Sequence, residues 1–490
     1  TTGASNAAVG YQALTSNTTG DQNTAIGFEA LALNTTADNN TAAGYYALRS
    51  NTTGTQNTAM GANALDANTT GGNNEAFGNG ALSANTTGIR NSAVGSSALG
   101  SNTTGDKNVA FGYSALASNT TADNNTAVGL EALYANTTGS GNTSVGYQAL
   151  DANTTGGSNT AVGYQALSSN TTNSHNTAFG YYALLNNDAA YNTALGKEAV
   201  RENTSGSRLV GVGNRALMNN TTGDYNHAFG DHALFDCTTG DANVAVGYEA
   251  AANLTTGDYN VAVGNKALSN ANVTGNNNCA IGRNSLYGCT TGNHNTAVGG
   301  SATLYGLSTG TYNTAVGVDA GQNISTGSNT TLIGYQAGTS GGAGGILVTE
   351  SNRIVLGNNA VTNFTAQVAL SVASDERDKA DITDFTKGLD IVNSLRPVTY
   401  RWDHRTNYDN GIPDGTHKES KLNIGLIAQE VETVEKANGY ATSNDDSLFI
   451  HKSTDGENYT LTYEKLIPVL VNSVKELSAE NTALKARLDA

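Results

Sequence analysis

The chain has little of what marks a compact enzyme. Among 490 residues there are three prolines, three cysteines and one tryptophan, and charged residues make up only 13%. Three cysteines are too few for a disulfide framework. The formal net charge is −17 with only 24 lysines and arginines, which argues against nucleic acid or an anionic membrane surface as a partner.

Long hydrophobic runs are also missing. No stretch of about 18 apolar residues exists, so the sequence predicts no membrane insertion. The chain begins at Thr1 in the middle of a repeat, with no basic segment followed by an apolar one, so no signal peptide is predicted. We expect the natural N-terminus, with any attachment domain, to lie further upstream.

What the chain has instead is a repeat built around glycine, of which there are 58. The glycine of an Asn-Thr-Ala-Val-Gly-like unit returns in about 20 copies between Gly10 and Gly334, at steps of 17 residues with one step of 16 and two of 18. Each copy holds two short apolar pieces and an Asn-Thr-Thr-Gly turn. This pattern predicts a parallel β-solenoid with two short strands per coil, over residues 1–345.

Stacked coils bring equivalent residues about 4.8 Å apart. Two asparagine columns are therefore expected to form ladders in which each side-chain amide bonds to the next. The columns begin with Asn23, Asn40, Asn57, Asn74 and Asn91, and with Asn17, Asn34, Asn51, Asn68 and Asn85. Gly27 and its equivalents are predicted where the backbone turns sharply or takes a positive φ.

Neighbouring strand residues are apolar on both sides. Ala25 and Ile26 point in opposite directions along a strand, and so do Ala178 and Phe179. One side fills the thin coil, and the other is either simply exposed or covered by another chain. We favour a subunit interface.

The repeat over about residues 5–340 resembles the head domain of trimeric autotransporter adhesins. That family carries an Asn-Ser-Val-Ala-Ile-Gly-like strand in a left-handed β-roll. The resemblance implies a parallel homotrimer of such rolls and implies nothing about what they bind.

Three features of the repeat have ordinary interpretations. A column of aspartates that includes Asp21, Asp224 and Asp258 is read as a solvated turn rather than a cation site. Cys237 and Cys289 replace asparagines of the second column and are read as small buried thiols. No stable carboxylate pair marks a glycosidase, and no metal or cofactor is predicted.

The character of the sequence changes near residue 346. Residues 352–357 predict one more strand, and residues 346–373 are read as a neck. About 35 of the last 117 residues are charged, against about 30 of the first 373, and all three prolines lie there. Residues 374–490 therefore form a separate small α+β domain with its own core.

The last 26 residues, 465–490, predict a helix with a heptad seam. The seam is Ile467, Leu470, Val474, Leu477, Asn481, Leu484 and Leu488. A 3,4-spaced apolar row predicts a left-handed coiled coil, and one polar seam residue fixes register and oligomer number. The alternative is a single amphipathic helix that packs on its own domain.

Four segments of this domain carry a resemblance: 374–379 (Ser-Asp-Glu-Arg-Asp-Lys), 395–402, 424–431 and 461–463. In this order they resemble the peptidase S74 intramolecular chaperones of phage tailspikes and fibres. In that family a Ser–Lys pair cuts the chain at the serine after the trimer has formed. The resemblance assigns Ser374 and Lys379 as catalytic residues, with Asp375 and Arg377 flanking the cleavage site.

The chemistry that the resemblance implies is physically sound. A serine hydroxyl needs a base to take its proton. Lys379 is a base only when neutral, which burial or a nearby positive charge favours by lowering its pKa. Arg377 is the expected charge and the closed trimer the expected burial. The alternative is that the serine merely caps a helix and the lysine is a surface charge.

The sequence as a whole predicts a homotrimeric phage tail fibre or tailspike stem in the virion, with self-cleavage as its one enzymatic step. Its partner would be a host surface receptor, with glycans among the candidates. The alternatives are a bacterial or archaeal cell-surface adhesin and, third, a glycan depolymerase.

Overall fold

The computed structural model describes residues 2–270, 272–339, 346–358, 360–361, 364–365, 367, 374–405, 408, 411–443, 445–452 and 459–489. It divides into two compact units, Thr1–Thr314 and Ala315–Ala490, each of which is considered by itself.

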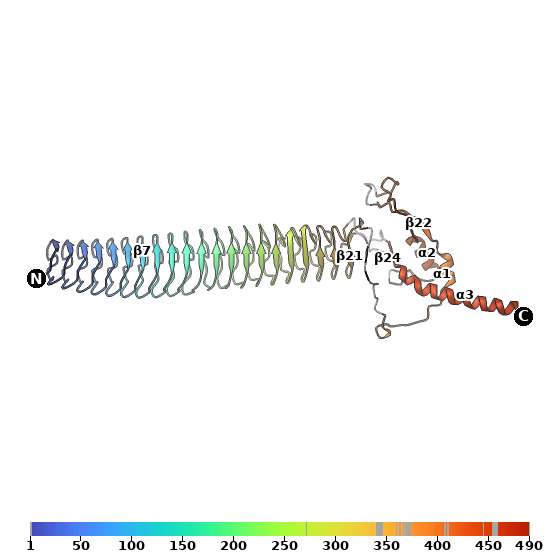
Figure 1. Cartoon of the computed structure of the whole chain (residues 1–490), viewed down its shortest axis with the longest axis horizontal. Coiled ribbons are helices and arrows are strands. Elements are labelled where there is room, and N and C mark those ends of the chain that lie inside the picture. Colours follow the sequence, from blue (N-terminus) through green and yellow to red (C-terminus); the bar gives the residue numbers. More distant parts are fainter. Residues whose placement is uncertain are drawn as a thin grey trace. The chain divides into compact units, whose positions relative to one another are not determined.

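The first unit is a parallel β-solenoid in which each coil contributes one short strand (Figure 1). Ala25 pairs with Ala42, 17 positions on, and this register repeats from coil to coil. The strands are β1 Ala7–Val9, β2 Thr24–Ile26, β3 Thr41–Ala43, β4 Thr58–Met60, β5 Glu75–Phe77, β6 Ser92–Val94, β7 Val109–Phe111, β8 Thr126–Val128, β9 Thr143–Val145, β10 Thr160–Val162, β11 Thr177–Phe179, β12 Thr193–Leu195, β13 Val210–Val212, β14 His227–Phe229, β15 Val244–Val246, β16 Val261–Val263, β17 Cys279–Arg283 and β18 Thr296–Ser301. The predicted solenoid of about 17-residue coils is confirmed; its left-handed sense and its trimeric state stay predictions.

The prediction of two strands per coil is wrong. The second apolar piece is a turn, because every other residue there is left-handed: Glu29 has φ 53° and Leu31 has φ 50°. The piece is nevertheless bonded from coil to coil, since the Leu31 amide donates to the Ala47 carbonyl at 3.0 Å. Ala30 and Leu31 are fully buried. The coil thus closes on itself within 17 residues while its apolar side chains still point inward.

The repeating glycine is required by close approach. Gly27 has φ 134°, and a Cβ placed on it would lie 2.3 Å from the carbonyl oxygen of Gly44. Only glycine fits a backbone that takes this conformation against the next coil. The prediction made for Gly27 is confirmed.

Both asparagine columns are buried ladders, and they bond differently. In the second column Asn34 Nδ2 donates to Asn17 Oδ1 at 3.0 Å and to the Ala37 carbonyl at 3.0 Å. In the first column Asn23 Oδ1 accepts the Asn40 backbone amide at 3.0 Å, and Asn23 Nδ2 donates to the same Ala37 carbonyl at 2.8 Å. The amide-to-amide ladder is confirmed for the second column, while the first column ties side chains to backbone.

The second column becomes apolar after Asn220. Its later members in this unit are Cys237, Leu254, Val273, Cys289 and Leu307, all fully buried. From Cys237 onward, the amide-to-amide hydrogen bond is found in the first column instead, where Asn243 Nδ2 donates to Asn226 Oδ1 at 3.1 Å. The second column therefore changes from hydrogen-bonded to apolar along the solenoid, while the first column stays hydrogen-bonded.

The aspartate column also stabilises the stack. Asp38 Oδ1 accepts the backbone amide of Asp21 at 2.7 Å, and Asp241 Oδ1 accepts that of Asp224 at the same distance. Asp21 and Asp241 are exposed as predicted for a solvated turn, whereas Asp38, Asp224 and Asp258 are half-buried. Each of these carboxylates accepts a backbone amide of the neighbouring coil.

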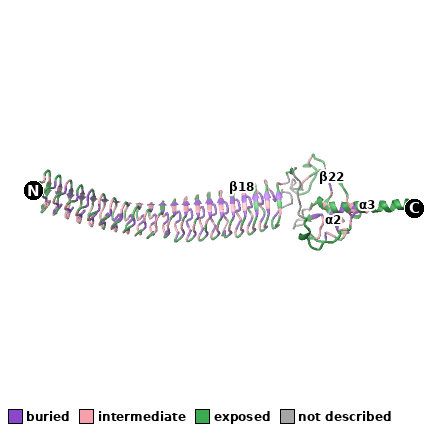
Figure 2. Ribbon diagram, turned by 60° about the horizontal axis from the view of Figure 1, so that its bottom comes forward, coloured by how far each residue is buried: buried purple, intermediate pink, exposed green. Residues whose placement is uncertain are grey.

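The third residue of each strand forms an outward apolar row. Ala25 is fully buried while Ile26 is 48% exposed, and Ala178 and Phe179 show the same alternation. A second row follows two residues after each strand and includes the stacked rings of Tyr147 and Tyr164, whose centroids lie 5.1 Å apart. Figure 2 shows buried positions along the strands and exposed ones along the coil edges. We call these two rows the apolar strip.

The second unit begins with two more coils and continues with the α+β domain. Its elements are β19 Thr314–Val316 at the boundary, β20 Thr331–Ile333, β21 Ile354–Leu356, η1 Glu376–Asp378, α1 Leu389–Ser394, β22 Val398–Tyr400, β23 Asn423–Gly425, α2 Ala428–Ala437, β24 Ile450–Lys452, β25 Tyr459–Leu461, η3 Tyr463–Lys465 and α3 Leu466–Leu488. The predicted extra strand is confirmed, because β21 pairs in parallel with β20.

The α+β domain has a small core of its own. Ile391 of α1, Val431 of α2, Phe449, Ile450 of β24 and Val469 of α3 are buried together. The predicted boundaries after residues 345 and 373 stay predictions, because residues 340–345 and 368–373 lie outside the described part. No helix within the described residues is long and apolar enough to cross a membrane.

We expect Asn119→Ala to lower the free energy of unfolding by about 1–3 kcal/mol, because it leaves buried partners unsatisfied. Asn119 Nδ2 donates to Asn102 Oδ1 at 2.8 Å and to the Ala122 carbonyl at 3.0 Å. Guanidinium unfolding followed by circular dichroism measures the change. The control is Thr121→Ala at an exposed position of the same coil; equal effects of the two variants would contradict the ladder's role.

We expect Cys237 and Cys289 to resist alkylation in the folded protein. Burial raises the pKa of Cys237 to about 12 and that of Cys289 to about 11. The reactive thiolate is therefore scarce at pH 8. Mass spectrometry after iodoacetamide treatment should show both thiols modified only when guanidinium is present, and rapid labelling of the native chain would refute this.

Candidate self-cleavage site

The segment that carries the predicted dyad is a tight turn around η1. Asp375 precedes this helix and caps it, since its Oδ1 accepts the Arg377 backbone amide at 3.0 Å. The Lys379 amide closes the turn by donating to the Glu376 carbonyl at 3.1 Å. The turn folds the chain back so that residues five apart meet.

The two predicted catalytic side chains are in contact. Lys379 Nζ lies 2.7 Å from Ser374 Oγ, within hydrogen-bond distance. This is the arrangement in which an amine can take the hydroxyl proton as the oxygen attacks a carbonyl carbon. Both side chains are exposed.

Asp375 and Arg377 form an ion pair beside the dyad. The guanidinium donates from Nε to Asp375 Oδ1 at 3.0 Å and from Nη2 to Oδ2 at 2.6 Å. This hydrogen bonding, with the Arg377 backbone amide second, holds the pKa of Asp375 below its usual value. The same bond raises the pKa of Arg377.

This pairing changes the role expected for Arg377. The sequence predicted Arg377 as a positive charge acting on Lys379, but Asp375 balances that charge at contact distance. The dyad is also exposed, so the single chain does not supply the predicted burial. The turn brings the side chains of Ser374 and Lys379 together, and burial of this pair would have to come from a part of the assembly that covers the turn.

The other three predicted segments meet in the domain core. β22 and β23 pair antiparallel, with Val398 opposite Gly425. Arg396 Nε donates to Glu430 Oε2 at 3.0 Å. The Tyr463 hydroxyl accepts the Leu426 amide at 3.0 Å. Segments 395–402, 424–431 and 461–463 thus pack as one unit.

Sequence reasoning missed two residues that shape this unit. Glu435 is a buried carboxylate that accepts from the Ser447 hydroxyl at 2.9 Å and from the Phe449 amide at 2.5 Å. Gly388 lies against α3, where a Cβ would meet the Ser473 backbone nitrogen at 2.6 Å. In the sequence, Glu435 is one of several charged residues in a helical segment and Gly388 is a single glycine. Neither position therefore indicated a buried carboxylate or a close helix contact.

Residues 374–440 match the family model Peptidase_S74, described as chaperone of endosialidase. The C-terminal region is a chaperone-of-endosialidase domain. The match begins at Ser374 and includes the dyad, β22, β23 and α2. No curated protein matches the chain.

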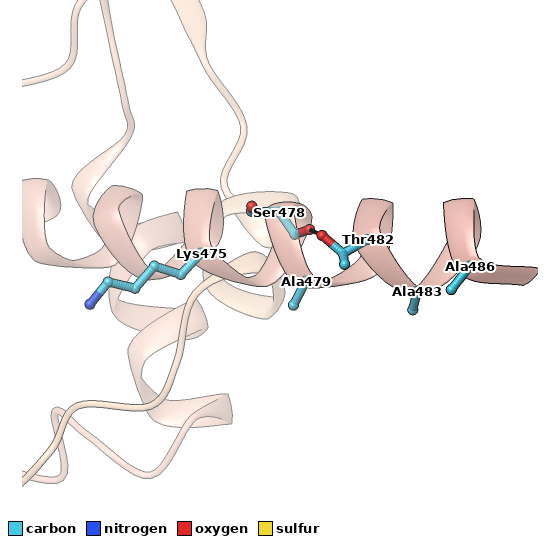
Figure 3. A pocket seen from close by; sticks show the side chains of 6 residues that line it. All are labelled: Lys475, Ser478, Ala479, Thr482, Ala483 and Ala486. Carbon is cyan, nitrogen blue, oxygen red and sulfur yellow. Dashed lines mark hydrogen bonds between the residues drawn. The ribbon is translucent and has the colours of Figure 1, made fainter.

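The outer face of α3 in this chaperone domain carries a shallow groove away from the dyad. Figure 3 shows its lining residues on the helix, Lys475, Ser478, Ala479, Thr482, Ala483 and Ala486. The only hydrogen bond drawn there, from Thr482 Oγ1 to the Ser478 carbonyl at 2.8 Å, lies within the helix. In Figure 3 the Lys475 side chain points away from the Ser478 hydroxyl, so these two residues are not arranged like the Ser374–Lys379 dyad.

We expect the chain to cut itself next to Ser374, giving a rod of about 374 residues and a tail of about 116. Ser374→Ala should abolish cutting, because it removes the nucleophile. Lys379→Ala should abolish it or slow it by about 100-fold or more, the usual size of a general-base effect. Intact mass and denaturing gels over time measure the products.

Both variants should fold, since the two side chains are exposed. Glu376→Gln, in the same turn and outside the dyad, is the matched control and should be processed like the wild type. Normal processing of Ser374→Ala would show that the dyad assignment is wrong.

Proposed function

We propose that this chain is a homotrimeric fibre of the phage tail-fibre or tailspike type. Its chaperone domain aligns three copies and is then released by self-cleavage at Ser374. The observation that carries the proposal is the exposed heptad seam of α3. The virion is the proposed location.

The seam is apolar apart from Asn481, and among the described residues it stays exposed. Ile467, Val474 and Leu484 are 59%, 65% and 53% exposed. An adjacent face of the same helix packs on its own domain, where Val469 and Ser473 are buried. The helix can therefore pack on its own domain and still present the seam to partner helices. Three such helices would bury it as a coiled coil in which Asn481 fixes the register.

The apolar strip of the solenoid supports the same state. Its first row, the third strand residues, is apolar in all of β1–β18 and exposes Phe111 at 57% and Phe179 at 53%. Its second row is interrupted by polar residues such as Asn79, Lys197 and Asp231. A continuous apolar surface such as the first row marks an interaction site in soluble proteins. Three solenoids in parallel would cover their strips with one another.

Near-identical coils create a register problem that an aligning domain solves. If one chain slipped by one coil, most contacts would be replaced by equivalent ones, so the wrong register would cost little. A chaperone domain with a unique core and a polar seam residue fixes the starting register. Once it is released, the rod has no template along which to separate and is kinetically stable.

The proposed cleavage is an acyl transfer followed by hydrolysis. Lys379 accepts the proton from Ser374 Oγ, the oxygen attacks a backbone carbonyl carbon, and the departing amine takes the proton back. Water then hydrolyses the ester. The amine of Lys379 must first become neutral, and burial of the exposed turn in the assembled trimer would favour that state.

Cleavage of the expected Ser374–Asp375 bond limits which chain can supply the nucleophile. If Ser374 Oγ attacked its own carbonyl carbon it would close a strained four-membered ring. Attack on the carbonyl before Ser374 would close an unstrained five-membered ring within the chain. Cleavage between Ser374 and Asp375 by this hydroxyl therefore requires a second chain, which would itself couple cutting to assembly.

We expect light scattering to give three times the chain mass of 50.1 kDa. Leu477→Lys should weaken the trimer of the uncleaved protein, because it puts three charges into the seam. The matched control is Ala479→Lys on the groove face two residues away, which should leave the trimer intact. A 50.1 kDa monomer in native buffer would refute the proposal.

A further inference from the structure

One outward position of the solenoid carries side chains that stack from coil to coil. It lies two residues before each strand, and we call it the pre-strand position. The backbone there is left-handed in every coil concerned, with φ 57° at Arg208, 58° at Tyr225 and 57° at Tyr259. Equal backbone conformations one coil apart project their side chains in the same direction. The rings of His175 and Tyr191 accordingly stack at 5.1 Å and 12°.

Arg208 is held between two tyrosines at this position. Its Cζ lies 5.7 Å from the ring centroid of Tyr191 and 5.2 Å from that of Tyr225. A cation within about 6 Å of a ring centroid is attracted by the ring. The two tyrosines are two coils apart, and the guanidinium of the coil between them fills the space.

The next pair of tyrosines repeats this arrangement without the arginine. Tyr225 and Tyr259 are again two coils apart, and the residue between them is Ala242, with φ 55°. Two strand spacings put the rings roughly 9.6 Å apart, so a group midway lies about 4.8 Å from each. The Ala242 methyl group occupies little of that space. Tyr225 and Tyr259 are 50% and 63% exposed.

The charge beside this space is negative. Asp224, Asp241 and Asp258 precede the three pre-strand residues, one in each coil. Their Oδ1 atoms point along the stack: Asp241 Oδ1 accepts the Asp224 amide at 2.7 Å, and Asp258 Oδ1 accepts the Asp241 amide at 2.8 Å. Next to Arg208 itself the corresponding residue is the neutral Ser207. Asp224 Oδ1 accepts the Ser207 amide at 2.6 Å and so lies beside the coil of Arg208, which leaves Asp241 and Asp258 as the carboxylates next to the space without a cation.

We propose that Tyr225 and Tyr259 form a slot for an organic cation, specifically a quaternary ammonium group of the choline type. The two ring faces attract the cation, the carboxylates of Asp241 and Asp258 add electrostatic attraction, and Ala242 forms the floor. The Tyr191–Arg208–Tyr225 sandwich is the internal precedent for the geometry. The slot lies within the coils of one chain and is independent of the cleavage and assembly proposed above.

The experiment titrates the full-length chain with choline chloride by isothermal titration calorimetry and saturation-transfer NMR. The uncharged isostere 3,3-dimethylbutan-1-ol is titrated in parallel. We expect one choline site per chain and at least tenfold weaker binding of the isostere. Tyr225→Ala and Tyr259→Ala should each weaken choline binding about fivefold or more, the loss of one ring's cation–π attraction.

Two exchanges between neighbouring coils give the sharpest test. Ala242→Arg should block the slot with a guanidinium, as Arg208 does in its own coils. Arg208→Ala should open a second slot between Tyr191 and Tyr225, so that the stoichiometry rises from one to two. Each exchange introduces a residue that a nearby coil already holds at this position, so the solenoid should keep its thermal unfolding temperature.

The matched control is Tyr312→Ala. Tyr312 is an exposed pre-strand tyrosine whose ring stacks on His294 at 5.0 Å, and its loss should leave choline binding unchanged. A parallel measurement with phosphatidylcholine vesicles distinguishes the molecules that could carry the choline group. Co-sedimentation of the protein with the vesicles would assign a lipid headgroup. Binding of soluble choline alone would assign another carrier. Equal binding of choline and its isostere, or unchanged binding in Ala242→Arg, would overturn the proposal.

Discussion

Hydrogen bonds from each coil to the next are the interaction on which the solenoid depends. A 17-residue coil encloses little more than an alanine and a leucine side chain, too little apolar volume to be stable alone. Many of its backbone amides, both asparagine columns and the aspartate column have partners one coil away, as when Asn34 bonds to Asn17 and Asp38 bonds to Asp21. Bonds within a coil, such as that from Asn34 to Ala37, add to these. Stability is therefore a nearest-neighbour sum, as in other repeat proteins. The same property makes every register nearly equivalent, and the aligning role proposed for the C-terminal domain would solve that problem.

The interior is not uniform along its length, and this gives the stack a direction. Thirteen coils carry asparagine in the second column, and from Cys237 onward the column is apolar. A buried leucine such as Leu254 adds apolar burial where an asparagine only replaces bonds made to water. The coils with the apolar interior are those later in the chain, toward the chaperone domain in sequence. If folding of the solenoid started at these apolar coils, the coils with asparagine would be added to an end that is already stable. Alignment of the chains and formation of the coils would then begin at the same end of the solenoid.

The sequence was sufficient for features that depend on side-chain identity at a fixed period. The 17-residue step, the buried columns and the positive φ of Gly27 all follow from recurrence, and the Ser374–Lys379 contact was expected from a motif. It was not sufficient where backbone conformation decides. The Gln-Ala-Leu piece looks like a strand, yet left-handed residues such as Leu31 turn it while preserving bonds between coils. The pairing of Arg377 with Asp375 and the burial of Glu435 depend on local geometry that residue types alone leave open.

Because the backbone and the buried columns hold the coils together, the outward positions are free to vary. Their variation is not evenly spread: residues 188–266 contain 14 of the 30 charged residues found in residues 1–373. The same segment contains the Arg208 sandwich and the Tyr225–Tyr259 pair. Tyrosine in a left-handed conformation is unfavourable, and at Tyr259, 63% exposed, little burial offsets that cost. Asparagine, which occupies this position in several other coils, would be easier to accommodate. Backbone preference and burial therefore do not account for Tyr259, whereas the ligand slot proposed above would.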